Sequence, residues 1–411
     1  MEKYNREVVI ESQSRQRIAE VTEEMRVADV DCLVIFMPTS IWPNVYMQML
    51  HTINRPLLLW AGDRIEGCEG IGLWAMRGAL DVVGFSPFKC VYGVPDNEKT
   101  VKQAWTYIDS CRVKAQLKKS VFGQFGSMPM GMLAGLMDDV DWIRQFGITS
   151  EHLESFSTLQ LVGEYSRQEV NRVYKRIIDW TGAEYPLDEP LERECRLYLA
   201  LREMIEQYQL DFAGLKGYFE LTDHYCQGSL AKSLLMTERY VMASTTEPLG
   251  ALTMYIMRLF NPGAPLTQAN VEQVDRSKSI VRMAFDGVLD FTAMECKYAG
   301  AIQAAPFSKA KPPSLWLSSM AQTGPATFAR LSRIRDEYVM LIARTKSVKV
   351  DDFRAQLGFP RCTAFALKLL SGNTERFIAQ LRSQYGHIIW ADCADELIAL
   401  CELLEVKPIV C

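Results

Sequence analysis

The chain has 411 residues, of which 48% are hydrophobic and 23% charged, and its formal net charge at pH 7 is −5. This length allows two or three domains with cores of their own. The acidic balance provides no basic surface, so nucleic acid is excluded as an expected partner.

The first 160 residues alternate strand and helix signals. Short, nearly continuous apolar runs are typical of strands buried on both faces. Such runs lie at 30–37, 55–62, 89–93 and 120–123. Helical patterns lie at 14–27, 44–52, 70–84 and 98–116. Repeated strand–helix units predict an N-terminal α/β domain, residues 1–160, with a parallel sheet covered by helices.

Residues 161–279 repeat this alternation. Helical patterns occur at 167–180, 191–208, 226–237 and 250–259. Apolar runs typical of strands begin at 211, 240 and 265. This segment is therefore predicted to be a second, Rossmann-like α/β domain.

After about residue 280 the pattern changes to short strands separated by turn residues. The expected strands lie at 288–296, 326–335, 338–344, 363–370 and 387–392, and a helix is expected at 395–404. This pattern predicts a β-rich C-terminal domain, residues 280–411, built as an antiparallel barrel or sandwich with a final helix.

Cysteine, histidine and hydropathy patterns limit the class of protein further. The 11 cysteines form no Cys-x-x-Cys pair, which is typical of reduced thiols and not of a zinc site. The four histidines are too few for a His-rich metal centre. A polar start and the lack of a long apolar run predict a cytoplasmic protein without a membrane partner.

Several short motifs stand out from this background. One region contains Thr222-Asp-His-Tyr, then Ser244-Thr-Thr-Glu-Pro-Leu-Gly-Ala-Leu-Thr-Met, then Gln268-Ala-Asn-Val. A Gly-rich stretch, Val121-Phe-Gly-Gln-Phe-Gly-Ser-Met-Pro-Met-Gly-Met, fits neither a P-loop nor a dinucleotide fingerprint. Near the end, His387-Ile-Ile-Trp-Ala-Asp precedes the final helical pattern.

Together these motifs resemble the L-fucose isomerase and arabinose isomerase superfamily of sugar isomerases. The resemblance covers nearly the whole chain, including the order of two α/β units and a β-rich domain. It implies a sugar-like small-molecule substrate and a homo-oligomer, with the Gly- and Met-rich segment 123–137 as a candidate subunit contact. In that family a Glu, an Asp and a His hold a Mn²⁺ or Mg²⁺ ion.

The ligand positions of the family are only partly kept here. The Glu position falls on Ser244 or Thr245, and the Asp position falls on Asn270. The His position falls on His387, and a second acidic position falls on Glu247. Because two negative charges are missing, we expect no tightly bound metal cofactor, and His387 is the one family ligand that remains.

Aldose–ketose isomerisation moves a proton between neighbouring carbons through an ene-diolate, and it needs a base, an acid and nearby positive charge. The expected function is therefore that of a sugar isomerase-like enzyme with weak or no metal dependence. Glu247 and His387 are the expected catalytic residues. The expected substrate-binding residues are Asp223, Tyr225, Ser244, Thr245 and Asn270.

Other interpretations of these residues stay open. The chain could be a diverged protein of the isomerase fold, with a different reaction or a non-catalytic binding or regulatory role. Glu247 also fits a carboxylate at a helix start, and His387 fits a buried histidine bonded to the backbone. Thr222 or Asp223 fits a helix N-cap.

Overall fold

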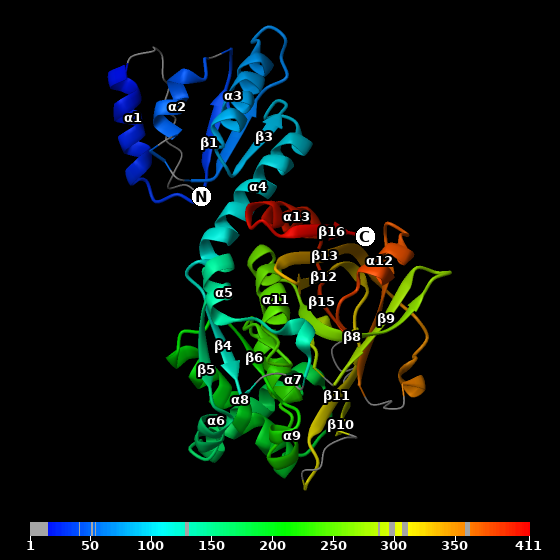
Figure 1. Ribbon diagram of the computed structural model, residues 1–411. Helices are drawn as coiled ribbons and strands as arrows, with labels where there is room; N and C mark the ends of the chain where they lie inside the picture. Colours follow the sequence, from blue (N-terminus) through cyan, green and yellow to red (C-terminus); the bar gives the residue numbers. More distant parts are fainter. Residues whose placement is uncertain are drawn as a thin grey trace. The chain divides into compact units, whose positions relative to one another are not determined.

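In a computed structural model the chain forms two compact units, residues 1–116 and 117–411 (Figure 1). The structure describes residues 15–411 except 41, 51, 54, 128–130, 287, 296–300, 306–310 and 358–361. The expected N-cap Ser14 lies outside the described residues. Among the described helices, none is long and apolar enough to cross a membrane.

The N-terminal unit contains a parallel sheet with strand order β1-β2-β3. Its strands are β1 (Leu33–Met37), β2 (Leu57–Ala61) and β3 (Phe88–Tyr92). Its helices are α1 (Arg15–Val27), α2 (Asn44–Leu50), α3 (Glu69–Val83) and α4 (Glu98–Leu117). Alternate residues of β1 are buried because one face of this sheet packs against a core that also contains Leu73 and Met76 of α3.

The C-terminal unit begins with a second parallel sheet, of strand order β5-β4-β6-β7. Its strands are β4 (Val121–Phe125), β5 (Thr149–Leu153), β6 (Phe212–Leu215) and β7 (Met242–Ala243). The accompanying helices are α5 (Asp139–Phe146), α6 (Ser155–Leu161), α7 (Arg167–Thr181), α8 (Glu189–Gln207), α9 (Glu220–His224), α10 (Ser229–Thr237) and α11 (Pro248–Phe260). Strand pairing therefore joins segments 121–153 and 212–243 in one sheet.

A mixed nine-stranded sheet follows, and six of its strands close into a ring. The ring consists of β8 (Leu266–Asp275), β9 (Ile280–Phe285), β12 (Gly324–Ile334), β13 (Glu337–Val348), β14 (Thr363–Leu369) and β15 (Tyr385–Ile389). It closes because β14 pairs with both β9 and β13. The outer strands are β10 (Ala301–Ala304), β11 (Leu315–Met320) and β16 (Lys407–Val410), and the remaining helices are α12 (Thr374–Gln380) and α13 (Ala394–Leu403). A closed ring leaves fewer unpaired strand edges than an open sheet.

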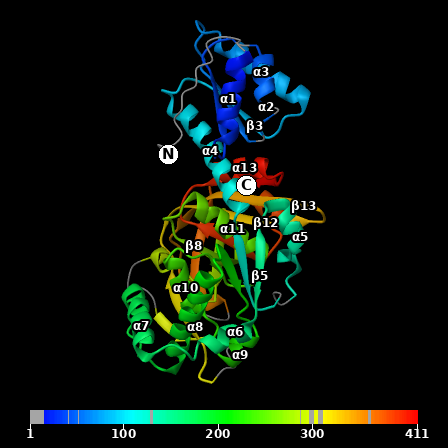
Figure 2. The same ribbon diagram turned by 90° about the vertical axis from the view of Figure 1, so that its left-hand side faces the viewer.

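These observations confirm the predicted fold class, with two α/β sheets followed by a β-rich region. The predicted domain boundaries near residues 160 and 279 stay predictions. Helix α11 lies against β8, β12 and β15 of the ring and also contacts β6 and β7. Figures 1 and 2 show α11 beside β12. The start of α11 therefore lies where the second parallel sheet meets the ring.

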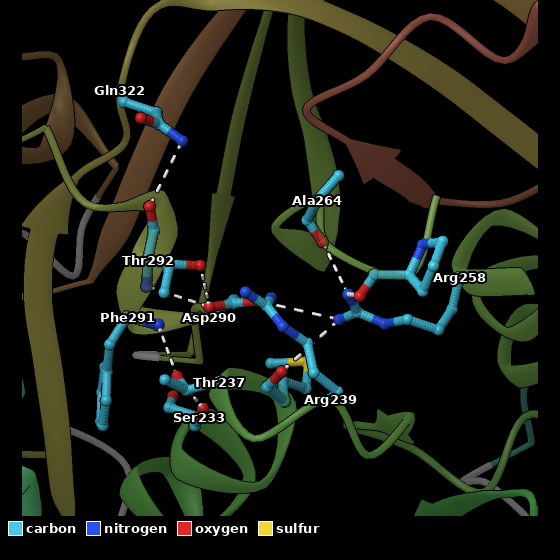
Figure 3. Close-up of polar contacts among 11 residues, drawn as sticks. Ser233, Thr237, Arg239, Arg258, Ala264, Asp290, Phe291, Thr292 and Gln322 are labelled. Carbon is cyan, nitrogen blue, oxygen red and sulfur yellow. Dashed lines mark hydrogen bonds and ion pairs between the residues drawn. The ribbon is translucent and has the colours of Figure 1, made fainter. Parts of the chain in front are cut away.

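The strand expected at 288–296 is wrong over its described part, which contains the short 3-10 helix η3 (Phe291–Ala293). Figure 3 shows the cause. The Asp290 carboxylate accepts hydrogen bonds from the Thr292 backbone N–H and hydroxyl, at 2.9 and 2.6 Å, and it is paired with Arg239. A side chain that bonds its own neighbouring backbone competes with strand pairing.

Candidate functional site

The candidate site begins in the segment that leads from β7 into α11. Glu247 occupies the N-cap position of α11, but its side chain makes no capping hydrogen bond. Instead, Arg330 of β12 binds both carboxylate oxygens: Nη1 donates to Oε2 at 2.7 Å and Nη2 donates to Oε1. The side chains of Arg330 and Glu247 are 0% and 1% exposed. A buried, bidentate ion pair therefore joins the start of α11 to the ring.

Two glycines make room for this pair. A Cβ on Gly135 would overlap the Glu247 side chain. A Cβ on Gly250 would lie 2.7 Å from His387 Nε2 and 2.9 Å from Glu247 Oε2. Because one glycine touches both side chains, the structure brings Glu247 and His387 together.

His387 extends the site along the ring. It lies on β15 directly opposite Gln268 of β8, and opposite residues of antiparallel strands place their side chains on the same face. The Gln268 side chain in turn accepts a hydrogen bond from Ser244 N at 3.2 Å and contacts Thr245 Oγ1 at 3.5 Å. Ser244, Thr245, Glu247, Gln268 and His387 thus form one contiguous buried cluster.

Several polar atoms in this cluster lack hydrogen-bond partners among the described residues. They are Ser244 Oγ, Arg330 Nε and both ring nitrogens of His387. Burial, together with the positive charge of Arg330, lowers the pKa of His387 well below its ordinary value, and a contact with the Ala329 backbone acts in the opposite direction. The imidazole is therefore neutral. Buried polar atoms are nearly always bonded in folded proteins, so a group of unbonded ones indicates a place for ligand or water.

Asn270 follows on the same strand. It is two residues from Gln268, on the same face of β8, and lies opposite Tyr385 of β15. Burial raises the pKa of the nearby Glu272, and a hydrogen bond from Asn270 partly offsets this rise. The Asn270 amide therefore has a carboxylate as its neighbour.

Asp223 and Tyr225 have a different setting. Helix α9 begins at Glu220 with Phe219 at its N-cap, so the expected N-cap role of Thr222 or Asp223 is wrong. The carbonyl oxygen of Tyr225 accepts a hydrogen bond from Arg193 of α8 at 3.0 Å, and the Arg193 guanidinium lies 5.8 Å from the ring centre. Contacts with α8 thus hold Tyr225, whereas α11 and the ring hold the Glu247 cluster.

Sequence reasoning missed Arg330, Gln268 and a buried lysine, Lys232 of α10. Lys232 is 1% exposed. Burial lowers its pKa to about 8, although the negative charges of Asp286 and Glu194 act in the opposite direction. A single basic residue within a mostly apolar stretch is the signal that could have indicated both cationic side chains. Lys232 lies in residues 230–236, and Arg330 lies in residues 326–331.

The donors of the site do not suit a hard divalent cation. Among the described residues, no group of three or more His, Cys, Asp or Glu could hold a metal ion. Arg330 already neutralises Glu247, and the other donors of the cluster are neutral. A divalent cation prefers charged oxygen ligands and would be repelled by the guanidinium.

Comparison with known proteins relates the chain distantly to a sugar isomerase. No protein-family model matches the sequence. The chain is 22% identical over 373 residues to sulfoquinovose isomerase from Clostridium sp. (strain MSTE9), a match that covers 88% of this chain and 81% of that protein. The specific L-fucose and arabinose isomerase superfamily stays a prediction.

Proposed function

We propose that the protein is a sugar isomerase-like enzyme that moves a proton between neighbouring carbons of a sugar-like substrate. The observation that carries this proposal is the group of unbonded buried polar atoms around Glu247, Arg330 and His387. These side chains converge from three separate segments of the chain, and the distant relation to a sugar isomerase supports the same class of reaction.

Four residues of the cluster have a role in the proposed reaction, together with Arg330 and Asn270. Glu247 and His387 are the proton-transfer pair: the Glu247 carboxylate takes the proton from one carbon and, once protonated, returns it to the neighbouring carbon, while the neutral imidazole of His387 moves the proton between the two substrate oxygens. Arg330 is always charged and stabilises the negative oxygen that develops in the ene-diolate. Substrate oxygens that accept hydrogen bonds from Arg330 free Glu247 from the ion pair. Ser244, Thr245 and Asn270 bind substrate hydroxyls.

In this proposal the Arg330 guanidinium provides the positive charge, and catalysis does not depend on a tightly bound metal ion. The poor fit of the donors to a divalent cation supports this view. The protein is also proposed to be a homo-oligomer, and light scattering that gives only the 46.7 kDa mass of one chain would contradict that proposal.

The test is an aldose–ketose interconversion assay with and without a chelator. We expect turnover that the chelator does not change, and we expect Glu247→Gln and His387→Asn to lower kcat by at least about a hundredfold, as for loss of an acid–base group. Glu337→Gln, on the exposed end of β13, is the matched control and should retain activity. Circular dichroism of each variant checks that it is folded. Chelator-sensitive turnover would show that the metal argument is wrong.

A second candidate function is non-catalytic sugar binding by a diverged member of the fold. The observation that favours it is that both oxygens of Glu247 are already bonded by Arg330 in a fully buried pair. Binding of sugars without turnover of any aldose or ketose would support this second candidate and exclude the first.

A further inference from the structure

A second group of ionisable side chains, Lys232 and Asp286, has no part in the proposed proton transfer between carbons. Lys232 lies on α10, and the half-buried Asp286 directly follows β9. Lys232 is 1% exposed, and in the described part of the chain its Nζ has no hydrogen-bond or ion-pair partner. Nζ is not among the enclosed polar atoms that lack a partner, so it retains surface that a small molecule can contact. A buried amine without a partner indicates a place for a ligand.

The surroundings of the amine leave room beside it. A Cβ on Gly217 would lie 3.7 Å from Lys232 Nζ, so a glycine faces the amine. The next residue is Tyr218, whose Oη accepts a hydrogen bond from Gln227 Nε2 at 2.9 Å. The Tyr218 O–H in turn donates to the Asp286 carboxylate. Lys232 and Asp286 act on each other electrostatically, yet no ion pair joins these two described side chains.

Both side chains can exchange a proton near neutral pH. Burial raises the pKa of Asp286 from 3.8 to about 6, although the charge of Lys232 and the hydrogen bond from Tyr218 act in the opposite direction. Burial lowers the pKa of Lys232 to about 8. At pH 7 the carboxylate is therefore ionised and the amine protonated, which makes one a base and the other an acid.

Strand pairing and electrostatics connect these side chains to the candidate site. Ala284 of β9, two residues before Asp286, pairs with Asn270 of β8, and Asn270 pairs with Tyr385 of β15. Burial raises the pKa of Tyr385, and the negative charges of Asp286 and Glu247 raise it further. Because Coulomb effects weaken with distance, Tyr385 lies near both carboxylates and links the two groups of side chains.

We propose that Asp286 and Lys232 open the ring of a cyclic aldose, so that the protein also interconverts the two anomers of the sugar. This inference rests on the proposed function for its choice of substrate, since an ene-diolate forms only from the open-chain sugar. It adds an activity that needs no C–H bond to break, and it assigns that activity to residues other than Glu247 and His387.

The ring opens by transfer of one proton to each group's partner on the sugar. The Asp286 carboxylate takes the proton of the C1 hydroxyl, and the electrons of that O–H bond form the C1=O bond. The bond between C1 and the ring oxygen breaks, and the ring oxygen receives a proton from the Lys232 ammonium. Return of the proton from Asp286 to Lys232 restores both groups. Closure on the other face of the carbonyl gives the other anomer.

Polarimetry measures this activity apart from isomerisation. The full chain is added to freshly dissolved α-D-glucose, α-D-galactose or α-D-xylose, and the approach to the anomeric equilibrium is compared with that in buffer. We expect the wild type to accelerate this approach for at least one of the three probes. Asp286→Asn and Lys232→Met should each lower the rate above buffer by at least about a hundredfold, as for loss of an acid or base.

Matched variants separate catalysis from a structural role. Glu247→Gln should lower aldose–ketose turnover by at least about a hundredfold but anomer interconversion by less than about tenfold, because the ring opens before a C–H bond breaks. Asp336→Asn removes a carboxylate that is 98% exposed and is the matched control for Asp286→Asn. Circular dichroism checks the fold of each variant. The two residues are replaced separately, so misfolding of one variant leaves the other as the test.

The possible outcomes distinguish this inference from the proposed function. It is overturned if the wild type accelerates none of the three probes, or if a folded Asp286→Asn or Lys232→Met variant keeps the wild-type rate. Turnover of an aldose whose anomers the protein does not interconvert would also overturn it, while supporting the proposed function. Anomer interconversion that needs Asp286 and Lys232, without aldose–ketose turnover, would support it and contradict the proposed function.

Discussion

Two buried arginine–carboxylate contacts in the C-terminal unit have the same chemistry but different surroundings. Asp290 is fully buried between Arg239 and Arg258 and also accepts two hydrogen bonds from Thr292 (Figure 3). Arg258 in turn donates to the carbonyl oxygen of Ala264 at 2.7 Å. Apart from Arg258 Nε, no buried side-chain polar atom drawn around Asp290 lacks a partner among the described residues.

The Glu247–Arg330 pair is equally buried, but its neighbours are not satisfied. Ser244 Oγ, Arg330 Nε and both nitrogens of His387 lack partners in the described part of the chain. The hydrogen bonds and ion pairs of Asp290 hold η3 in place, whereas the buried polar atoms around Glu247 have no hydrogen-bond partner in the described part of the chain. A buried ion pair is therefore not by itself a sign of function, and the hydrogen bonding of its neighbours distinguishes the two cases.

The largest expected effect comes from breaking the Glu247–Arg330 pair. Arg330→Met leaves Glu247 buried without a partner and should lower the free energy of unfolding by about 3–5 kcal/mol. The double variant Arg330→Met/Glu247→Leu removes both charges and should recover most of that loss. Urea unfolding compares the wild type, the single variants Arg330→Met and Glu247→Leu, and the double variant. Losses that simply add in the double variant would show that the two residues are not coupled.

A third buried carboxylate, Glu194 of α8, extends the comparison because no arginine of the described residues pairs with it. It accepts backbone hydrogen bonds from Gly228, Leu230 and Ala231 at the start of α10. Burial raises its pKa from 4.5 to about 7, against the opposing effects of these bonds and of Lys232.

Since the folded protein holds this proton more tightly than the unfolded chain, stability should fall as pH rises from 4.5 to about 7. The expected fall from this one group is about 3 kcal/mol. Glu194→Gln cannot titrate and should show a flatter dependence when the free energy of unfolding is measured across this range. An unchanged slope would contradict the prediction.

Two glycines give the smallest effects, with opposite signs. Gly250→Ala places a methyl group against His387 and Glu247 and should destabilise the protein by about 1–3 kcal/mol through overpacking. Gly78→Ala, in α3, meets no atom within 4 Å and should stabilise it by about 0.5–1 kcal/mol through helix propensity. Thermal unfolding measures the change in stability of each variant relative to the wild type. A stabilising Gly250→Ala would show that the cluster can relax.

Local patterns predicted much of the fold. The helices at 98–116 and 167–180 and the buried strand at 55–62 were recognisable because apolar periodicity is a short-range signal. Strand β9 was missed, and the segment after it was predicted as a strand. In that segment Asp290 bonds Thr292 locally, and Arg239 and Arg258 bind Asp290 from elements that are distant in sequence.

The sequence by itself determined the fold class and the change from strand–helix to strand–turn periodicity. These features depend on residue type and on neighbours along the chain. Only the tertiary structure decided that Arg330 binds Glu247, that Gly250 touches both Glu247 and His387, and that Tyr385 lies near both Glu247 and Asp286. Such contacts depend on ring closure and on strand register, which join residues more than 80 positions apart.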